Sequence, residues 1–188
     1  MATIVVAPSN QQHSLLSPNN YKSYLYAMIP PDQIKQRAKD ERKANKKFFR
    51  QLSQRKPKHL DQTVSGLHEE VFEEMDCLVC ANCCKTTSPI FIDKDIDRIA
   101  RHLGMRPAQF VTNYLHLDSD GDYVLNESPC AFLGEDNYCS IYEVRPRACR
   151  EYPHTNRKNF HQILDLTLKN TAVCPAVFEI VKRLREVN

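Results

Sequence analysis

Cysteine is the residue type in this chain that points most directly to chemistry. The run CLVCANCC places four thiols within eight residues, at Cys77, Cys80, Cys83 and Cys84. Four more cysteines follow, at Cys130, Cys139, Cys149 and Cys174, and none precedes the run. A C-x2-C step lets two thiolates converge on one ion while backbone amides between them donate to sulfur. The sequence therefore predicts a metal centre for which all eight cysteines are candidate ligands.

The first three cysteines of the run form two fused steps, C-x2-C-x2-C. Bacterial ferredoxins use this spacing to bind three corners of a cubane cluster, and their fourth thiolate comes from a distant Cys-Pro pair. The chain has one distant Cys-Pro pair, Cys174-Pro175. The spacing thus favours an iron–sulfur cluster, of the 4Fe-4S type, on Cys77, Cys80, Cys83 and Cys174. Zinc remains the alternative metal, because it also accepts four thiolates.

The adjacent pair Cys83-Cys84 indicates that the run serves more than one partner, since neighbouring side chains do not easily point to the same place. The cysteines outside the ferredoxin-like set are again four in number: Cys84, Cys130, Cys139 and Cys149. Our hypothesis is that the eight thiols form two tetrathiolate sites joined at this pair. The pair could equally straddle two edges of one polynuclear site.

Three arginines, Arg145, Arg147 and Arg150, flank Cys149. Four thiolates on a divalent ion, or on an oxidised cubane cluster, leave about two negative charges. The guanidinium groups could bind such a cofactor by neutralising this charge and donating to sulfur, or they could lie on the exposed face of a helix. His154 is a further candidate ligand, although the thiols already suffice.

Other cysteine chemistries fit the sequence less well. Radical-SAM enzymes need C-x3-C-x2-C, and Thr87 stands where the third cysteine would follow Cys80 and Cys84. The apolar run from Ile4 to Ala7 is too short for the core of a signal peptide. No stretch approaches the roughly 20 apolar residues of a membrane span. We therefore expect a cytoplasmic protein with no membrane contact, whose thiols stay reduced and bind metal rather than form disulfides.

The elements that must position these thiols are predicted to be mainly helical with a few short strands, a small α+β fold with the metal centre as part of its core. An amphipathic helix over Val64–Met75, with His68 packed on its apolar face, leads into Cys77. Asp93 is expected to cap a second helix that ends at Gly104. Pro107, Pro146 and Pro175 are each expected to begin a helix, the first running to Leu115 and the second through Cys149.

The predicted strands are short, at Pro89–Ile92 and Tyr123–Leu125. Between them, Asp118, Asp120 and Asp122 invite a calcium interpretation, but Gly121 is misplaced for an EF-hand loop. A turn before the second strand is the better prediction. Residues 160–170 fit either a helical or a strand period.

A basic segment precedes the cysteine region. Residues 35–58 hold eleven Lys and Arg, among them Lys43, Lys46 and Lys47, against Asp40 and Glu41. The segment is either an electrostatic surface for nucleic acid or an acidic protein, or simply the solvated face of a helix. We predict three regions: an irregular segment 1–31, a basic helical extension 32–59 and a cysteine-cluster domain 60–188.

The cysteine pattern closely resembles the YkgJ-type cysteine-cluster family, whose domain is named for the CxxCxxCC run and described as zinc- or iron-chelating. The resemblance covers about residues 72–180 and includes PCAFLGEDNYCSIYEVRPRACREYP from Pro129 to Pro153. One departure is Ala81, where the family usually has glycine. A flagellin lysine methylase with the same run is regarded as an iron–sulfur protein, so the resemblance implies metal binding and, more remotely, a part in methyl transfer.

The sequence leaves three candidate functions for this chain. The first is a protein whose iron–sulfur, iron or zinc centre acts in redox chemistry, metal handling or modification of a partner. The second is an interaction module in which zinc replaces a core and the basic segment grips nucleic acid or an acidic partner. The third is a methylase-like enzyme, which rests on the family resemblance alone.

Overall fold

The computed structural model describes residues 29–55 and 57–187, so most of the predicted irregular segment 1–31 lies outside the described residues. Over this part the chain is mainly helical, as predicted, with one two-stranded antiparallel sheet. In order the elements are α2 (Ile34–Arg55), α3 (Leu60–Glu73), α4 (Cys77–Cys80), α5 (Asn82–Thr86), α6 (Asp93–His102), α7 (Pro107–Tyr114), β1 (Leu115–Leu117), β2 (Tyr123–Leu125), η2 (Tyr142–Val144), α8 (Arg147–Glu151), η3 (Phe160–Ile163), α9 (Leu164–Asn170) and α10 (Pro175–Glu186).

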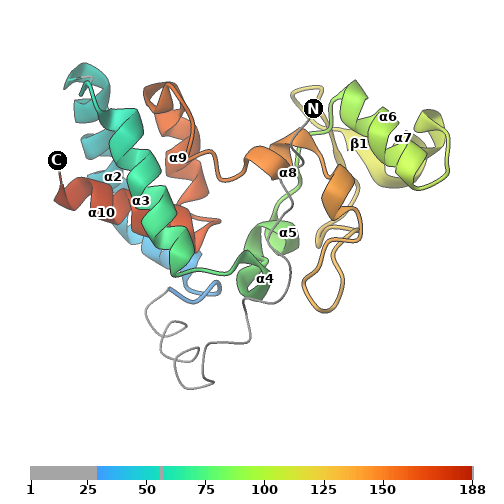
Figure 1. Ribbon diagram of the computed structural model, residues 1–188, viewed down its shortest axis with the longest axis horizontal. Helices are drawn as coiled ribbons and strands as arrows, with labels where there is room; N and C mark the ends of the chain where they lie inside the picture. Colours follow the sequence, from blue (N-terminus) through green and yellow to red (C-terminus); the bar gives the residue numbers. More distant parts are fainter. Residues whose placement is uncertain (1–28, 56, 188) are drawn as a thin grey trace, which may run out of the picture.

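Helices α2, α3, α9 and α10 gather at one end of the molecule (Figure 1). Each presents apolar side chains at helical spacing, as Val64, Leu67 and Val71 do on α3, so one face of every helix can be buried. Together these faces enclose the bundle core, which comprises Phe49, Leu52, Leu60, Val64, Leu67, Val71, Met75, Phe160, Leu164, Leu168, Cys174, Ala176, Val177, Ile180, Val181 and Leu184. Burial of this apolar surface is the main force that holds the four helices together.

Helices α6 and α7 and the β-hairpin lie at the other end of the molecule (Figure 1). In the hairpin Leu115 pairs with Leu125, and Leu117 pairs with Tyr123. These elements enclose a second apolar cluster, the hairpin core, made of Phe91, Ile96, Ile99, Ala100, Phe110, Leu115, Leu125, Phe132 and Ile141. The bundle core and the hairpin core share no residue. The segments between them therefore form the connection between the two ends of the molecule.

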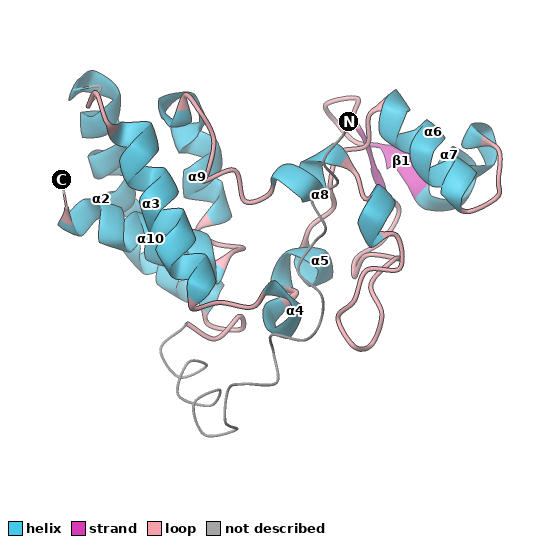
Figure 2. Ribbon diagram, in the orientation of Figure 1, coloured by secondary structure: helices cyan, strands magenta, loops and turns pink. Residues whose placement is uncertain are grey.

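The short helices α4, α5 and α8 lie between the two ends, joined to them largely by loops (Figure 2). Helices this short gain little stability from their own hydrogen bonds, because the first turn is costly to form. They are also the segments that carry five of the eight cysteines, since Cys77, Cys80, Cys83, Cys84 and Cys149 lie on them. The middle of the described part of the chain therefore carries five of the eight thiols, which lie outside the bundle core and the hairpin core.

Helix α2 carries the basic segment and packs onto the bundle. Phe49 and Leu52 belong to the bundle core, and Ile34 and Ala38 are buried against Phe178 of α10. An ion pair of 2.6 Å joins Glu41 to Arg185, which also donates to the buried Asn45. Helix α2 thus buries one apolar face against the bundle. The division of the chain at residues 31 and 59 stays a prediction.

Several predicted boundaries are confirmed. Pro107 and Pro175 are the first residues of α7 and α10, and Gly104, with φ +67, takes the left-handed conformation just beyond α6. Asp118 closes a turn, because its carboxylate accepts from the amides of Asp120 and Asp122 at 2.9 Å each. That carboxylate is already used by the turn before the second strand.

Other expectations were wrong in detail. The predicted strand at residues 89–92 is only an isolated bridge from Phe91 to Tyr123. Ile92 rather than Asp93 caps α6, and its amide donates to the Asp95 carboxylate. Helix α7 ends at Tyr114, since Leu115 turns into β1 to pair with Leu125.

Residues 160–170, which fit either period, form η3 and α9. No helix among the described residues is long and apolar enough to cross a membrane.

Candidate metal centre

The first four cysteines lie on α4 and α5, which are separated by Ala81 alone. Asp76 begins α4 by accepting a hydrogen bond from the Leu78 amide at 2.8 Å. Ala81 has φ 44 and ψ 18, the left-handed region that glycine adopts freely and that costs other residues about 1 kcal/mol or more. This turn separates the thiols of Cys77 and Cys80 from those of the next helix. The left-handed conformation also explains why glycine is usual at this position in the family that the sequence resembles.

The remote Cys174 is brought to this run by Asn82. The Asn82 side chain donates to the carbonyl of Val173 at 2.7 Å, although 91 residues separate the two. Burial raises the pKa of Cys80, and the Asn82 backbone amide offsets part of that increase. Asn82 is buried, and sequence reasoning missed it because an asparagine inside a cysteine run carries no signal of its distant partner.

Cys174 occupies the N-cap position of α10, directly before Pro175. The backbone amides of Val177 and Ala176 favour its thiolate form. A helix N-terminus stabilises a thiolate, so this position suits a metal ligand. Burial, together with the thiols of Cys77 and Cys80, nevertheless raises the pKa of Cys174 to about 12.

The other four cysteines, Cys84, Cys130, Cys139 and Cys149, come together on the side of the hairpin core. The Cys130 amide donates to the Cys84 carbonyl at 2.8 Å, and Cys139 bridges to Leu133. Burial raises the pKa values of Cys130 and Cys139, and backbone amides within the next three residues offset part of that increase. Amides so close to sulfur are typical of the turns that hold thiolate-bound metals. Both side chains pack against the hairpin core.

Burial and neighbouring thiols raise the pKa values of cysteines in both groups. Burial, followed by the thiols of Cys84, Cys130 and Cys139, raises the pKa of Cys149 to about 12. Burial and then Cys80 raise the pKa of Cys77 to about 11. Thiols with such pKa values are neutral near pH 7, so metal binding at either group would release protons.

The two groups adjoin at the adjacent pair. The sulfur atoms of Cys83 and Cys84 are 3.9 Å apart, and this contact is the main cause that raises the pKa of Cys84. Cys84 also contributes to the raised pKa values of Cys77 and Cys80. Within the described part of the chain, however, no three His, Cys, Asp or Glu side chains are closed into a metal-binding arrangement. The thiols are thus gathered into neighbouring groups without forming a finished site.

Tyr152 places a polar group, its hydroxyl, near the thiols of Cys80, Cys83 and Cys174. Sequence reasoning missed this residue. Its hydroxyl is buried and has no hydrogen-bond partner among the described residues. Burial and the nearby thiols of Cys174, Cys83 and Cys80 raise the pKa of Tyr152. An unsatisfied buried hydroxyl costs about 1 to 3 kcal/mol. Its neighbours are the sulfur atoms that would accept from it once they were deprotonated.

The predicted arginines differ in their surroundings. Arg145 stacks on the Tyr142 ring at 3.7 Å from the centroid; burial raises the pKa values of Cys139 and Cys149, and the Arg145 charge offsets part of that increase. Arg147 forms an exposed ion pair with Glu151. Arg150 is exposed and donates to the Arg145 carbonyl at 2.9 Å. Arg145 is therefore the one of the three whose charge acts on the thiols.

His154 lies beside Tyr152, with the two rings edge to face at 6.1 Å between centroids. Its backbone has φ +67, and its amide donates to the carbonyl of Glu151 at 2.8 Å. Burial lowers its pKa. The other histidine considered, His68, shares a 2.7 Å hydrogen bond with Thr155, and its ring packs against the Phe72 ring at a 36° tilt, in agreement with the predicted packing role.

Asp95 fixes the segment that carries Cys149. Only 1% of Asp95 is exposed, and its carboxylate accepts from Arg98 and, at 3.2 Å, from the Arg147 amide. Arg98 in turn donates to the carbonyls of Val144 and Arg145. These bonds tie α6 to the start of α8 across roughly 50 residues of sequence. Their partners are too distant in the chain for a sequence pattern to reveal.

Replacing Asp95 with alanine is expected to lower the free energy of unfolding by about 2 to 4 kcal/mol, because it strands the half-buried Arg98 and frees the Arg147 amide. Asp97→Ala, on the exposed face of the same helix, is the matched control and should change stability by less than about 0.5 kcal/mol. Urea unfolding of the metal-loaded proteins measures both. Equal effects would show that Asp95 does not hold α8.

Comparison with known proteins agrees with the chemistry of these residues. The search among curated proteins and the search among solved structures gave no match. The sequence model of the family CxxCxxCC, described as "Putative zinc- or iron-chelating domain", matches residues 76–174. The matched region begins at the residue that caps α4 and ends at the residue that caps α10, and it contains all eight cysteines. The chain therefore belongs to the CxxCxxCC family of zinc- or iron-chelating domains.

Proposed function

We propose that the chain holds two neighbouring thiolate centres. In this proposal the first thiol set (Cys77, Cys80, Cys83 and Cys174) binds a 4Fe-4S cluster. The second thiol set (Cys84, Cys130, Cys139 and Cys149) binds one iron or zinc ion. Zinc in both sets is the alternative, and it would make the protein a structural or zinc-handling one.

The observation that carries the proposal is the placement of the thiols against two separate cores. Cys174 belongs to the bundle core and Cys80 packs against it, whereas Cys130 and Cys139 pack against the hairpin core. The sets meet where the sulfur atoms of Cys83 and Cys84 are 3.9 Å apart. A thiolate-bound cofactor in each set would connect the two ends of the molecule through a middle that has little apolar surface of its own.

The donors around the first set suit an iron–sulfur cluster. Hydrogen bonds to cluster sulfur stabilise the reduced, more negative form and so raise the reduction potential. The amide of Asn82 beside Cys80, and the amides at the start of α10 beside Cys174, would supply such donors. A bound cluster would supply one-electron transfer. Because Cys77 is exposed on α4, a partner could approach the first set from that side.

Tyr152 supplies a specific test of this environment. Tyr152→Phe is expected to lower the reduction potential of the bound centre and to weaken metal affinity by about 10-fold to 100-fold, because the hydroxyl no longer donates to a thiolate. The same change should stabilise the metal-free protein, since it removes an unsatisfied buried hydroxyl. Redox titration, competition with a chelator and unfolding of the metal-free form measure the three effects.

Tyr138→Phe is the control, because Tyr138 is 51% exposed. It should leave the potential, the metal affinity and the metal-free stability unchanged. If Tyr152→Phe matched this control in potential and affinity, Tyr152 would have no role toward a bound metal. The thiol sets themselves would then still stand, because their test is metal content.

A further inference from the structure

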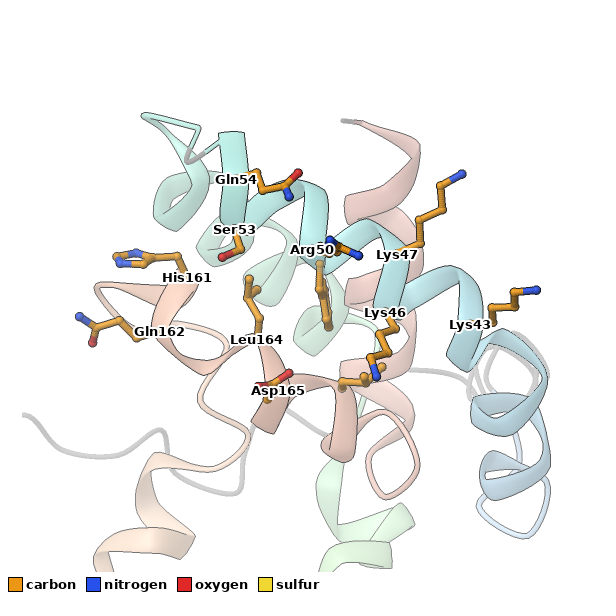
Figure 3. A pocket seen from close by; sticks show the side chains of 12 residues that line it. Lys43, Lys46, Lys47, Arg50, Ser53, Gln54, His161, Gln162, Leu164 and Asp165 are labelled. Atoms are coloured by element: carbon orange, nitrogen blue, oxygen red, sulfur yellow. The ribbon is translucent and has the colours of Figure 1, made fainter.

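A basic groove lies on the helical bundle, away from the cysteines. It has a cavity volume of about 660 Å³ and runs between the second half of α2 and the pair η3 and α9. Figure 3 shows Lys43, Lys46, Lys47 and Arg50 along its α2 side, with His161 and Asp165 on the other side. Phe49, Leu164 and Leu168, which belong to the bundle core, also line it. The groove thus combines a basic edge with a floor of three core side chains, which are 5% to 7% exposed.

The basic edge follows the helical repeat. Lys43, Lys46, Lys47 and Arg50 stand at positions i, i+3, i+4 and i+7, so they form one stripe along α2. From Lys43 to Gln54, the lining residues of α2 span about 16 Å, or three helical turns. A ligand that fits this stripe would carry negative charges at a matching spacing.

The charge of this stripe is not neutralised within the described part of the chain. No ion pair joins any of the four basic residues to a carboxylate there, whereas Arg185 pairs with Glu41 elsewhere on α2. Asp165 lines the groove without forming such a pair. The chain's own residues 1–28 contain no Asp or Glu, so they lack the charge that would complement the groove.

We propose that this groove binds an acidic, amphipathic helix of a partner protein. Helix-in-groove recognition places apolar side chains on an apolar floor and uses charges at the edge for orientation and association rate. Nucleic acid fits less well, because single strands are bound by exposed aromatic rings, whereas among the described residues that line the groove the one Phe, Tyr or Trp side chain, Phe49, is 5% exposed.

Two labelled probes test the proposal with the full-length protein. One is a helical peptide with Glu at i, i+3, i+4 and i+7 beside two leucines, and its control has Gln in place of Glu. The other is single-stranded oligothymidylate. Fluorescence anisotropy at low and high salt is expected to show binding of the Glu peptide that weakens with salt, and much weaker binding of the Gln peptide.

The charge-reversed variant Lys46→Glu/Arg50→Glu should weaken binding of the Glu peptide by about tenfold or more. Lys94→Glu/Arg101→Glu, on exposed positions of α6, makes the same change in net charge and should weaken it less than twofold. Circular dichroism checks the helical content of both, and Lys46→Ala/Arg50→Ala replaces the reversal if that variant does not fold.

Three outcomes would overturn the proposal: no binding of the Glu peptide at low salt, equal losses in the two charge-reversed variants, or tighter binding of oligothymidylate that the groove variant abolishes. The last would identify the groove as a nucleic-acid site. None of these results depends on the metal centre, because the groove shares no residue with the thiol sets.

Discussion

Cys174→Ser is expected to remove the iron–sulfur cluster and leave the ion of the second thiol set in place. In the proposed arrangement Cys174 is the remote ligand that closes the first set, and serine is a poor ligand for iron or zinc compared with a thiolate. Serine is also a good N-cap residue, so α10 should still begin at Pro175. The change therefore tests ligation with little direct damage to the helix.

The matched variant is Cys149→Ser in the second set. It should lose the single iron or zinc ion and keep the cluster colour, since Cys149 interacts with Cys84, Cys130 and Cys139. Iron, zinc and sulfide are measured on both purified variants. Loss of the same metal from both would contradict two separate sets and favour one polynuclear site that spans the Cys83-Cys84 pair.

Removal of the metals is expected to loosen the middle of the molecule much more than its two ends. Thiolate-bound metals in small domains contribute on the order of 10 kcal/mol, and α4, α5 and α8 are too short to persist alone. Hydrogen exchange of the chelated protein should therefore speed up by about 100-fold or more in residues 76–86 and 129–153. The bundle, with its sixteen-residue apolar core, should keep most of its protection.

Mass spectrometry of exchange before and after chelation, under reducing conditions, makes this measurement peptide by peptide. Metal added back to the chelated sample is the control and should restore the original pattern. Equal loss of protection in all helices would mean that the bundle depends on metal as well. No change anywhere would mean that the thiols do not hold a metal that matters for the fold.

Local sequence patterns predicted most of the helices. The apolar repeat of Val64, Leu67 and Val71 marked α3, and Pro107 and Pro175 marked the first residues of α7 and α10. These signals depend on residues within one or two turns of each other. Leu115 shows where such signals end: its helical spacing extended the predicted helix, but pairing with Leu125 placed it in β1.

The cysteines could be recognised as candidate metal ligands because the spacing of thiols is itself a chemical signal. The family match includes all eight of them. Their supporting residues were not readable. Asn82 reaches Val173, Asp95 reaches Arg147, and Tyr152 lies among thiols on three segments. Each of these contacts depends on the folded arrangement of distant segments. The basic stripe of α2 was likewise visible in the sequence, whereas the groove that it borders requires α9.

The most direct test of the two thiolate centres is one preparation, purified without oxygen and without a metal-affinity tag, on which the absorption spectrum, iron, zinc and acid-labile sulfide are all measured. We predict a brown protein with about four irons and four sulfides per chain, and one further iron or zinc ion. A colourless protein that holds only zinc would contradict the cluster. A folded protein that contains neither metal would contradict the central claim that these eight cysteines bind metal.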